Sequence, residues 1–148
     1  YARTKFHDYN IAYNSVAHLP NVKVFLDQIE GYKEFLMVSG EGLARQMMDF
    51  DYLLAVGELF TMVVYGQLII ESAKIEGISD EVLNQIFDVF VRDFSAYAVE
   101  LYGKPINTEA QLDKIMKMIK RPVPNKEEFE KVLNEEVYSL VDVYIQNP

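Results

Sequence analysis

The residues that could carry chemistry in this chain are few, and most of them interrupt one long apolar stretch. The polar interruptions between Phe50 and Ile75 are Asp51, Glu58, Gln67 and Glu71. A carboxylate inside an apolar bundle can have a raised pKa and act as a general base, so Glu58 is the candidate catalytic residue. The structural alternatives are that Glu58 faces solvent at the edge of the bundle or that it pairs with a cation, for which Arg45 or Arg92 is available. In that case Glu58→Ala should destabilise the fold by several kcal/mol, because a buried charge loses its partner.

Other catalytic chemistries lack their residues in this sequence. The chain has no cysteine, which excludes disulfides, thiolate metal sites and a cysteine nucleophile. The two histidines, His7 and His18, both lie near the start, and no Glu-x-x-His pair supplies the ligands of a di-iron bundle. Glycine-rich phosphate loops and serine-nucleophile motifs are absent as well. We therefore expect no metal centre and no self-contained active site.

The one compact basic cluster consists of Lys117, Lys120 and Arg121. It could bind the phosphates of a nucleotide-bearing ligand, or it could simply complement the C-terminal end of a helix, where positive charge is favourable. The net charge of −9 argues against a nucleic-acid surface and against an anionic membrane, because both need clustered cations.

The elements that must position these residues are helices. The stretch from Phe50 to Ile75 contains no proline and is apolar in nearly every helical direction, so we expect a central helix covered on all sides. Its small residues Ala55, Gly57 and Gly66 should let neighbouring helices approach closely. Gly66 costs about 1 kcal/mol relative to alanine, so close packing or a bend should compensate.

Within this stretch, the segment from Tyr52 to Ile70 carries one charged residue, Glu58, and its length just suffices to cross a membrane, which takes about 20 apolar residues. Glu58, Thr61 and Gln67 lie within it, and its flanks show no excess of positive charge on one side. We therefore expect no membrane span.

The remaining sequence predicts an all-α fold, an antiparallel up-and-down bundle of four to five long helices plus short ones. We expect helices in segments 1–18, 22–49, 50–76, 79–102, 108–120 and 125–148. Asn21, Ser79, Thr108 and Asn125 are the predicted N-caps, and a break is expected near Gly40. Residues 1–148 should form one domain. Because the chain starts at Tyr1 without a signal region, we expect the C-terminal part of a longer cytoplasmic polypeptide.

Residues 49–105 resemble the C-terminal helical domain of acyl-CoA dehydrogenase-like flavoproteins. The resemblance is carried by DFDYLLAVGELFTMVVYGQLIIE, by IFDVFVRDFSAYAVELYGKP and by the following MIKRPV. It implies a larger enzyme whose helical and β domains enclose FAD and an acyl-CoA thioester. In such an enzyme a glutamate removes the α-proton while the β-hydride passes to the flavin. The C-terminal bundle would help to bind FAD and would form subunit interfaces.

The sequence departs from this family at two motifs. Members often carry a Gln-x-x-Gly-Gly stretch that touches FAD, and the nearest match here is Glu100-Leu101-Tyr102-Gly103-Lys104. Glu100, Gly103 and Lys104 are therefore the candidate cofactor-binding residues, with a carboxylate in place of the amide. The Tyr-Glu-Gly-Thr stretch that carries the catalytic glutamate in many members is absent. The isolated chain should not catalyse alone.

A second hypothesis belongs to a different class, a stand-alone helical module that binds a protein through an acidic, tyrosine-rich surface. Its basis is the ten tyrosines, a residue type favoured at interfaces, although tyrosines also serve in cores. Both hypotheses require a partner to cover apolar surface. The expected partners are other domains of the same polypeptide or identical subunits in a homo-oligomer.

Overall fold

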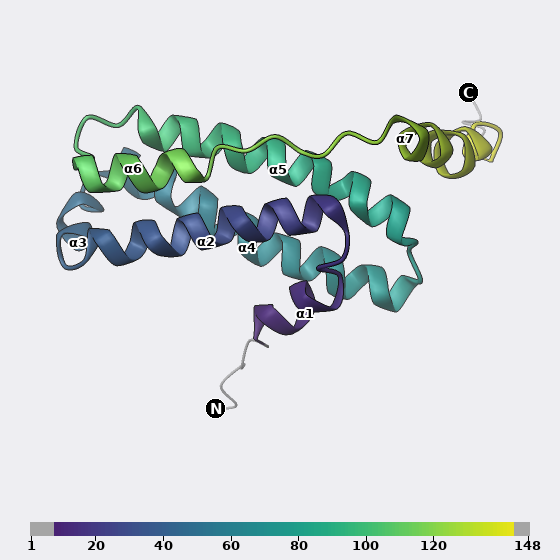
Figure 1. Cartoon of the computed structure of the whole chain (residues 1–148), viewed down its shortest axis with the longest axis horizontal. Helices are drawn as coiled ribbons and strands as arrows, with labels where there is room; N and C mark the ends of the chain where they lie inside the picture. The colour runs from purple at the N-terminus through teal and green to yellow at the C-terminus, as the bar shows by residue number, and fades with distance from the viewer. Residues whose placement is uncertain (1–7, 144–148) are drawn as a thin grey trace, which may run out of the picture.

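The computed structural model describes residues 8–143, and this part of the chain is helical, with short connections except for an extended segment, 118–125, between the last two α-helices (Figure 1). The α-helices are α1 (Tyr9–Ser15), α2 (Pro20–Ser39), α3 (Gly42–Gln46), α4 (Phe50–Glu76), α5 (Asp80–Tyr102), α6 (Glu109–Lys117) and α7 (Lys126–Val132). A π-helical turn, Leu133–Val137, and a 3-10 turn, Tyr138–Leu140, follow α7.

Four helices form the bundle, and they alternate in direction. In Figure 1, α2 and α5 run one way while α4 and α6 run the other, so successive members of the bundle are antiparallel. Helix α5 packs against α2, α4 and α6, and α2 also packs against α6. The predicted all-α antiparallel bundle is confirmed.

Local signals set most of the helix ends. The backbone of Gly77 is left-handed, with φ of 69°, and it closes α4 as predicted. Gly40 also has positive φ, 49°, and ends α2 at the predicted break. At the start of α6 the Thr108 hydroxyl accepts from the Gln111 backbone N–H at 3.2 Å, and Gln111 Oε1 accepts from the Thr108 backbone N–H at 2.9 Å. This is the predicted capping box.

The predicted N-cap role of Asn21 is wrong. Helix α2 begins at Pro20, two residues before the predicted start at Val22, and the fixed φ and missing N–H of proline suit the first position of a helix. Asn21 is instead buried. Its backbone N–H donates to Asn84 Oδ1 at 3.0 Å, and its side-chain Oδ1 accepts from the Val123 backbone N–H at 2.7 Å. It therefore ties α2 to α5 and to the segment after α6.

The predicted continuous helix from Asn125 to the chain end is also wrong. The regular helix ends at Val132, and the chain continues through the π-helical and 3-10 turns. The predicted N-cap Asn125 is confirmed, because its Oδ1 accepts from the Glu128 backbone N–H at 3.0 Å. The Glu128 carboxylate does not close a capping box and accepts from Asn84 and Gln85 of α5 at 2.7 and 2.8 Å. Residues 144–148 lie outside the described part of the chain, as do residues 1–7.

An aromatic cluster forms the centre of the core. The centroid of the Phe25 ring on α2 lies 5.5 Å from the ring centroid of Phe87, 5.7 Å from that of Phe90 and 5.4 Å from that of Phe94, all on α5 and each near edge-to-face. Tyr13 of α1 joins the cluster at 5.9 Å from Phe25.

Gly66 is where α1 meets α4, and its predicted close packing is confirmed. The hydroxyl of Tyr13 donates to the Val63 carbonyl at 2.6 Å, directly beside Gly66. A Cβ atom at position 66 would lie 2.3 Å from that hydroxyl oxygen. Only a glycine at position 66 leaves room for the Tyr13 hydroxyl.

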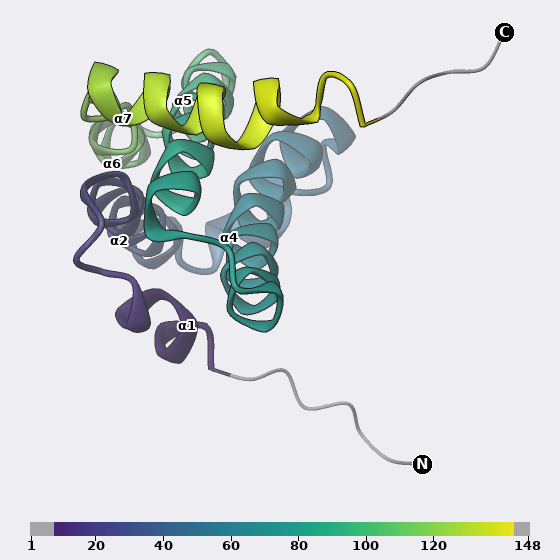
Figure 2. The same cartoon turned by 90° about the vertical axis from the view of Figure 1, so that its right-hand side faces the viewer.

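Helix α4 is not covered on all sides, which corrects the expectation from its composition. Its inner side is buried against the bundle at Tyr52, Leu59 and Ile70. Viewed along the bundle, α4 lies at one edge, and α5 takes the more central place (Figure 2). By length and composition α4 could cross a membrane, and 44% of its most apolar window is buried inside the fold. The core helix of a soluble protein meets the same criteria.

Candidate functional site

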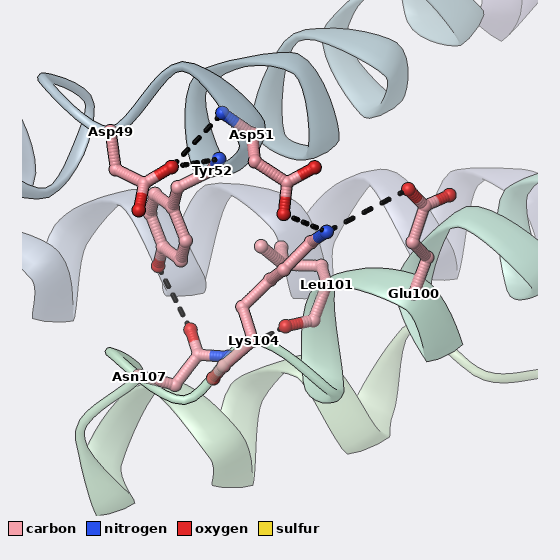
Figure 3. Close-up of polar contacts among 7 residues, drawn as sticks. All are labelled: Asp49, Asp51, Tyr52, Glu100, Leu101, Lys104 and Asn107. Carbon is pink, nitrogen blue, oxygen red and sulfur yellow. Dashed lines mark hydrogen bonds and ion pairs between the residues drawn. The ribbon is translucent and has the colours of Figure 1, made fainter.

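The sequence-predicted site residues gather at one end of the bundle, where the start of α4 meets the end of α5 (Figure 3). Lys104 follows α5, and its Nζ atom lies 2.5 Å from Asp51 Oδ2 and 4.0 Å from Glu100 Oε1. The hydrogen bond to Asp51 is the main reason that the pKa of Lys104 is raised. Gly103 is the C-cap of α5 and places the Lys104 backbone. The cation that pairs with Asp51 is therefore Lys104.

Tyr52 and Asn107 close the same cluster from the other side (Figure 3). The Tyr52 hydroxyl donates to Asn107 Oδ1 at 2.8 Å, and burial raises the pKa of that hydroxyl to about 12. Asn107 Nδ2 donates to the Leu101 and Lys104 carbonyls at 2.6 and 3.0 Å. These bonds fix the connection between α5 and α6 to the first turn of α4. The polar groups of this cluster form hydrogen bonds with one another, which is consistent with a structural role.

Glu58, the candidate catalytic residue, lies near this cluster but is not part of its hydrogen-bond network. Its Oε2 atom is buried without a hydrogen-bond partner among residues 8–143. Burial raises the pKa of the Glu58 carboxyl, Glu100 adds to the rise and Lys104 opposes it. The expected pairing with Arg92 is wrong, because Arg92 Nε donates to Asp88 at 2.8 Å. Glu58 lines neither of the two large grooves described below.

We expect Glu58→Gln to raise the free energy of unfolding at neutral pH. The raised pKa means that the folded state disfavours the ionised carboxyl relative to the unfolded state, so glutamine removes a penalty. The gain should shrink as pH falls through the raised pKa, and it should vanish below the ordinary value of 4.5, where both states are protonated. Urea unfolding at a series of pH values measures it. A loss of stability at neutral pH would show that a cation stabilises Glu58.

His18 and Lys117, two of the candidate residues, have structural partners. His18 Nε2 lies 2.9 Å from Asp80 Oδ2 at the surface, and His7 lies outside the described residues. Within residues 8–143, no group of three His, Cys, Asp or Glu side chains could hold a metal ion. Lys117 of the basic cluster and Lys114 both bind Glu34 Oε2, at 3.0 and 2.8 Å, and thereby join α6 to α2.

The feature that sequence reasoning missed is the outer face of α4. We define this face by its large apolar side chains that are at least half exposed, from 50% at Leu54 to 87% at Ile75: Phe50, Leu54, Phe60, Tyr65, Leu68 and Ile75. The signal was present in the sequence as apolar residues in every helical direction. That pattern predicts complete burial, but it fits equally well a helix that its own fold buries on one side only.

An apolar groove of about 480 Å³ lies beside this outer face. It is lined by α1, α2 and α4 through Tyr9, Ile29, Tyr32, Lys33, Leu36, Phe60, Val63, Val64 and Gln67. The ammonium group of Lys33 lies at its rim, 5.2 Å from the centre of the Tyr9 ring and 2.6 Å from Glu30 Oε1. Phe60 belongs to both the groove and the outer face, so the two form one continuous apolar surface.

A second groove, of about 580 Å³, lies between α5 and α7. Its lining combines apolar and charged side chains, among them Val89, Phe129, Asp88 and Arg92. Polar contacts hold α7 to α5: Lys131 Nζ lies 3.2 Å from Glu81 Oε1 at the surface, and Glu128 accepts from the buried Asn84 side chain at 2.7 Å.

Comparison with known proteins gives no match: no family model, no curated protein and no solved structure is significantly similar to this chain.

Proposed function

We propose that this chain is a helical interaction module that binds a protein surface through the outer face of α4. The observation that carries the proposal is the half-exposed row from Phe50 to Ile75, six large apolar side chains on one rigid helix. Contiguous apolar patches of this kind on soluble proteins mark interaction sites. The helix is held from behind by α5 and α1, so the face is pre-formed and little ordering is needed on binding.

A protein partner fits this face better than a lipid surface. The chain carries a net charge of −9, which opposes approach to an anionic membrane. An amphipathic helix that lies on a membrane usually carries lysine and arginine beside its apolar side. The charged residues on or beside the outer face include Asp51, Glu58 and Glu71, with Lys74 the one cation within α4.

A photo-reactive amino acid at position 68 tests this function in the cell that makes the protein. We expect Leu68 to give a covalent adduct with a protein, because a docked surface lies over it. Val99 on α5 is the matched control, since it is 54% exposed and Leu68 is 55% exposed. Equal labelling from both positions, or labelling of lipid alone from position 68, would contradict the proposal.

The resemblance to acyl-CoA dehydrogenase-like flavoproteins supplies a second candidate function, the C-terminal bundle of an FAD-dependent enzyme. The outer face supports it too, because a bundle within a larger polypeptide must pack against other domains or identical subunits. The candidate contacts to FAD, Glu100 and Lys104, face each other at 4.0 Å, and Lys104 is bound to Asp51. A ligand phosphate would have to compete with Asp51 for Lys104.

The visible absorption spectrum of the full-length gene product, purified without added cofactor, tests the flavoenzyme candidate. Bound oxidised flavin would give its two visible and near-ultraviolet bands. A colourless protein that also fails to bind added FAD would remove this candidate and leave the interaction module.

A further inference from the structure

The outer face of α4 has the spacing of a coiled-coil seam. Alternating steps of four and three residues connect Phe50, Leu54, Gly57, Thr61, Val64, Leu68, Glu71 and Ile75, and we call this row the seam. A repeat of seven residues with two seam positions lets the side chains of two helices interlock. Glu71 is the one charged residue in the row. The buried side of α4, at Leu59 and Ile70, lies roughly opposite, so the seam is not used within the bundle.

Gly57 forms a gap in the seam that the fold itself does not explain. A glycine in a helix interior lowers helix stability relative to alanine, so its presence calls for a packing reason. Gly66 has one, because the Tyr13 hydroxyl would lie 2.3 Å from a Cβ atom there. Around Gly57 no neighbouring atom of the described chain comes within 4 Å of a Cβ position. The space above Gly57 is open to a side chain from outside.

We infer that the seam binds the seam of a second copy of this chain, with the two α4 helices antiparallel. This inference rests on the proposed function and names its partner. In the register centred between Met62 and Val63, Gly57 lies opposite Leu68 of the second copy. Thr61 then lies opposite Val64, and Phe50 opposite Ile75. A leucine from each copy fills the gap left by the glycine of the other.

The seam favours the antiparallel arrangement over a parallel one. Two parallel helices in register would place Gly57 opposite Gly57, which leaves a void, and Glu71 opposite Glu71, which brings like charges together. The antiparallel register instead places Glu71 opposite Leu54. One polar residue in a coiled-coil seam lowers affinity but fixes the register, as in natural coiled coils.

The surface available is sufficient for such a dimer. A large aromatic or aliphatic side chain presents on the order of 150–200 Å². Four of the six exposed side chains lie in the seam, and Phe60 and Tyr65 lie beside it. Covering the exposed half of all six on both copies removes on the order of 1,000 Å² from water, the lower end for a specific interface. In Figure 2 the outer side of α4 faces away from α2 and α6, so the bundle does not block the approach of a second copy.

Sedimentation equilibrium of the full 148-residue chain over a range of concentrations tests the inference, with Gly57→Leu as the main variant. We expect a monomer–dimer equilibrium whose Kd rises roughly tenfold or more in Gly57→Leu, because the added side chain overfills the layer with Leu68. The Tm of the dilute monomer should rise, since leucine is a better helix former and the space is open. Adding Leu68→Ala to Gly57→Leu should restore the dimer, because the volume of the layer returns.

Whether Gly57→Leu raises or lowers the dimer Kd distinguishes a complementary seam from non-specific hydrophobic association. An added exposed leucine would strengthen non-specific association or binding to phosphatidylcholine–phosphatidylglycerol vesicles, so a tighter dimer in this variant overturns the inference. A second variant, Glu71→Leu, should tighten the dimer. A chain that stays monomeric at all concentrations also overturns it. In that case a cross-link from position 68 to a different protein would leave the proposed function standing, and cross-links to lipid alone would remove both.

Discussion

Gly66→Ala should lower the free energy of unfolding by about 3–4 kcal/mol, through overpacking and loss of a buried hydrogen bond. The new methyl group would lie 2.3 Å from the Tyr13 hydroxyl and 3.3 Å from Phe25, so the tyrosine must move. Moving it breaks its hydrogen bond to the Val63 carbonyl, 2.6 Å long, in a fully buried position. Because Tyr13 is also the link between α1 and the core, α1 should loosen with it.

Urea unfolding of four variants at low protein concentration measures this effect: Gly66→Ala, Gly57→Ala, Tyr13→Phe and the Tyr13→Phe/Gly66→Ala double variant. Gly57→Ala is the matched control, the same change in the same helix where no atom lies within 4 Å, and it should stabilise by about 1 kcal/mol. Removing the hydroxyl by Tyr13→Phe should make Gly66→Ala less costly than it is alone, a coupling that a double-mutant cycle detects. If Gly66→Ala and Gly57→Ala had the same effect, α1 could not lie where the structure places it.

Gln28→Ala should destabilise the fold by about 3 kcal/mol, because it leaves a cavity and removes hydrogen bonds in a fully buried site. Gln28 Nε2 lies 3.1 Å from the Val91 carbonyl, 3.0 Å from Ser95 Oγ and 3.0 Å from the Met118 carbonyl. It thus joins α2 to α5 and to the end of α6. Gln28 Oε1 has no partner among the described residues, so the amide is held through its nitrogen alone.

Hydrogen exchange locates the effect of Gln28→Ala, and denaturant unfolding gives its size. The amides of α6 should exchange faster, because the carbonyl of its C-cap Met118 loses a donor from the core. Gln85→Ala is the control, since Gln85 is only partly buried and binds Glu128 at 2.8 Å at the surface of α5. It should cost less than about 1 kcal/mol and leave the exchange of α6 unchanged. Equal costs for the two variants would contradict the role assigned to Gln28.

The candidate site was only partly accessible from the sequence. The family-like motif drew attention to Glu100 and Lys104, and the structure brings both close to Glu58, because the end of α5 packs on the start of α4. The partner of Lys104 is Asp51, 53 residues away, and no local pattern predicts that pair. Arg92, one of the cations predicted for Glu58, instead pairs with Asp88 four residues earlier on the same helix. Long-range charge pairs depend on how helices are rotated about their axes.

The sequence by itself determined the helices and most of their ends, because caps, glycines and prolines act on their neighbours within one or two turns. Ser79, Gly77 and the Thr108–Gln111 capping box are of this kind. Only the tertiary structure decided which helix stands at the edge, which side of α4 stays exposed, and why two glycines of one helix differ. Gly66 meets Tyr13 and Gly57 meets open space. The physical reason is that burial depends on which helices pack together, and an apolar side chain looks the same in the sequence whether its own fold or a partner covers it.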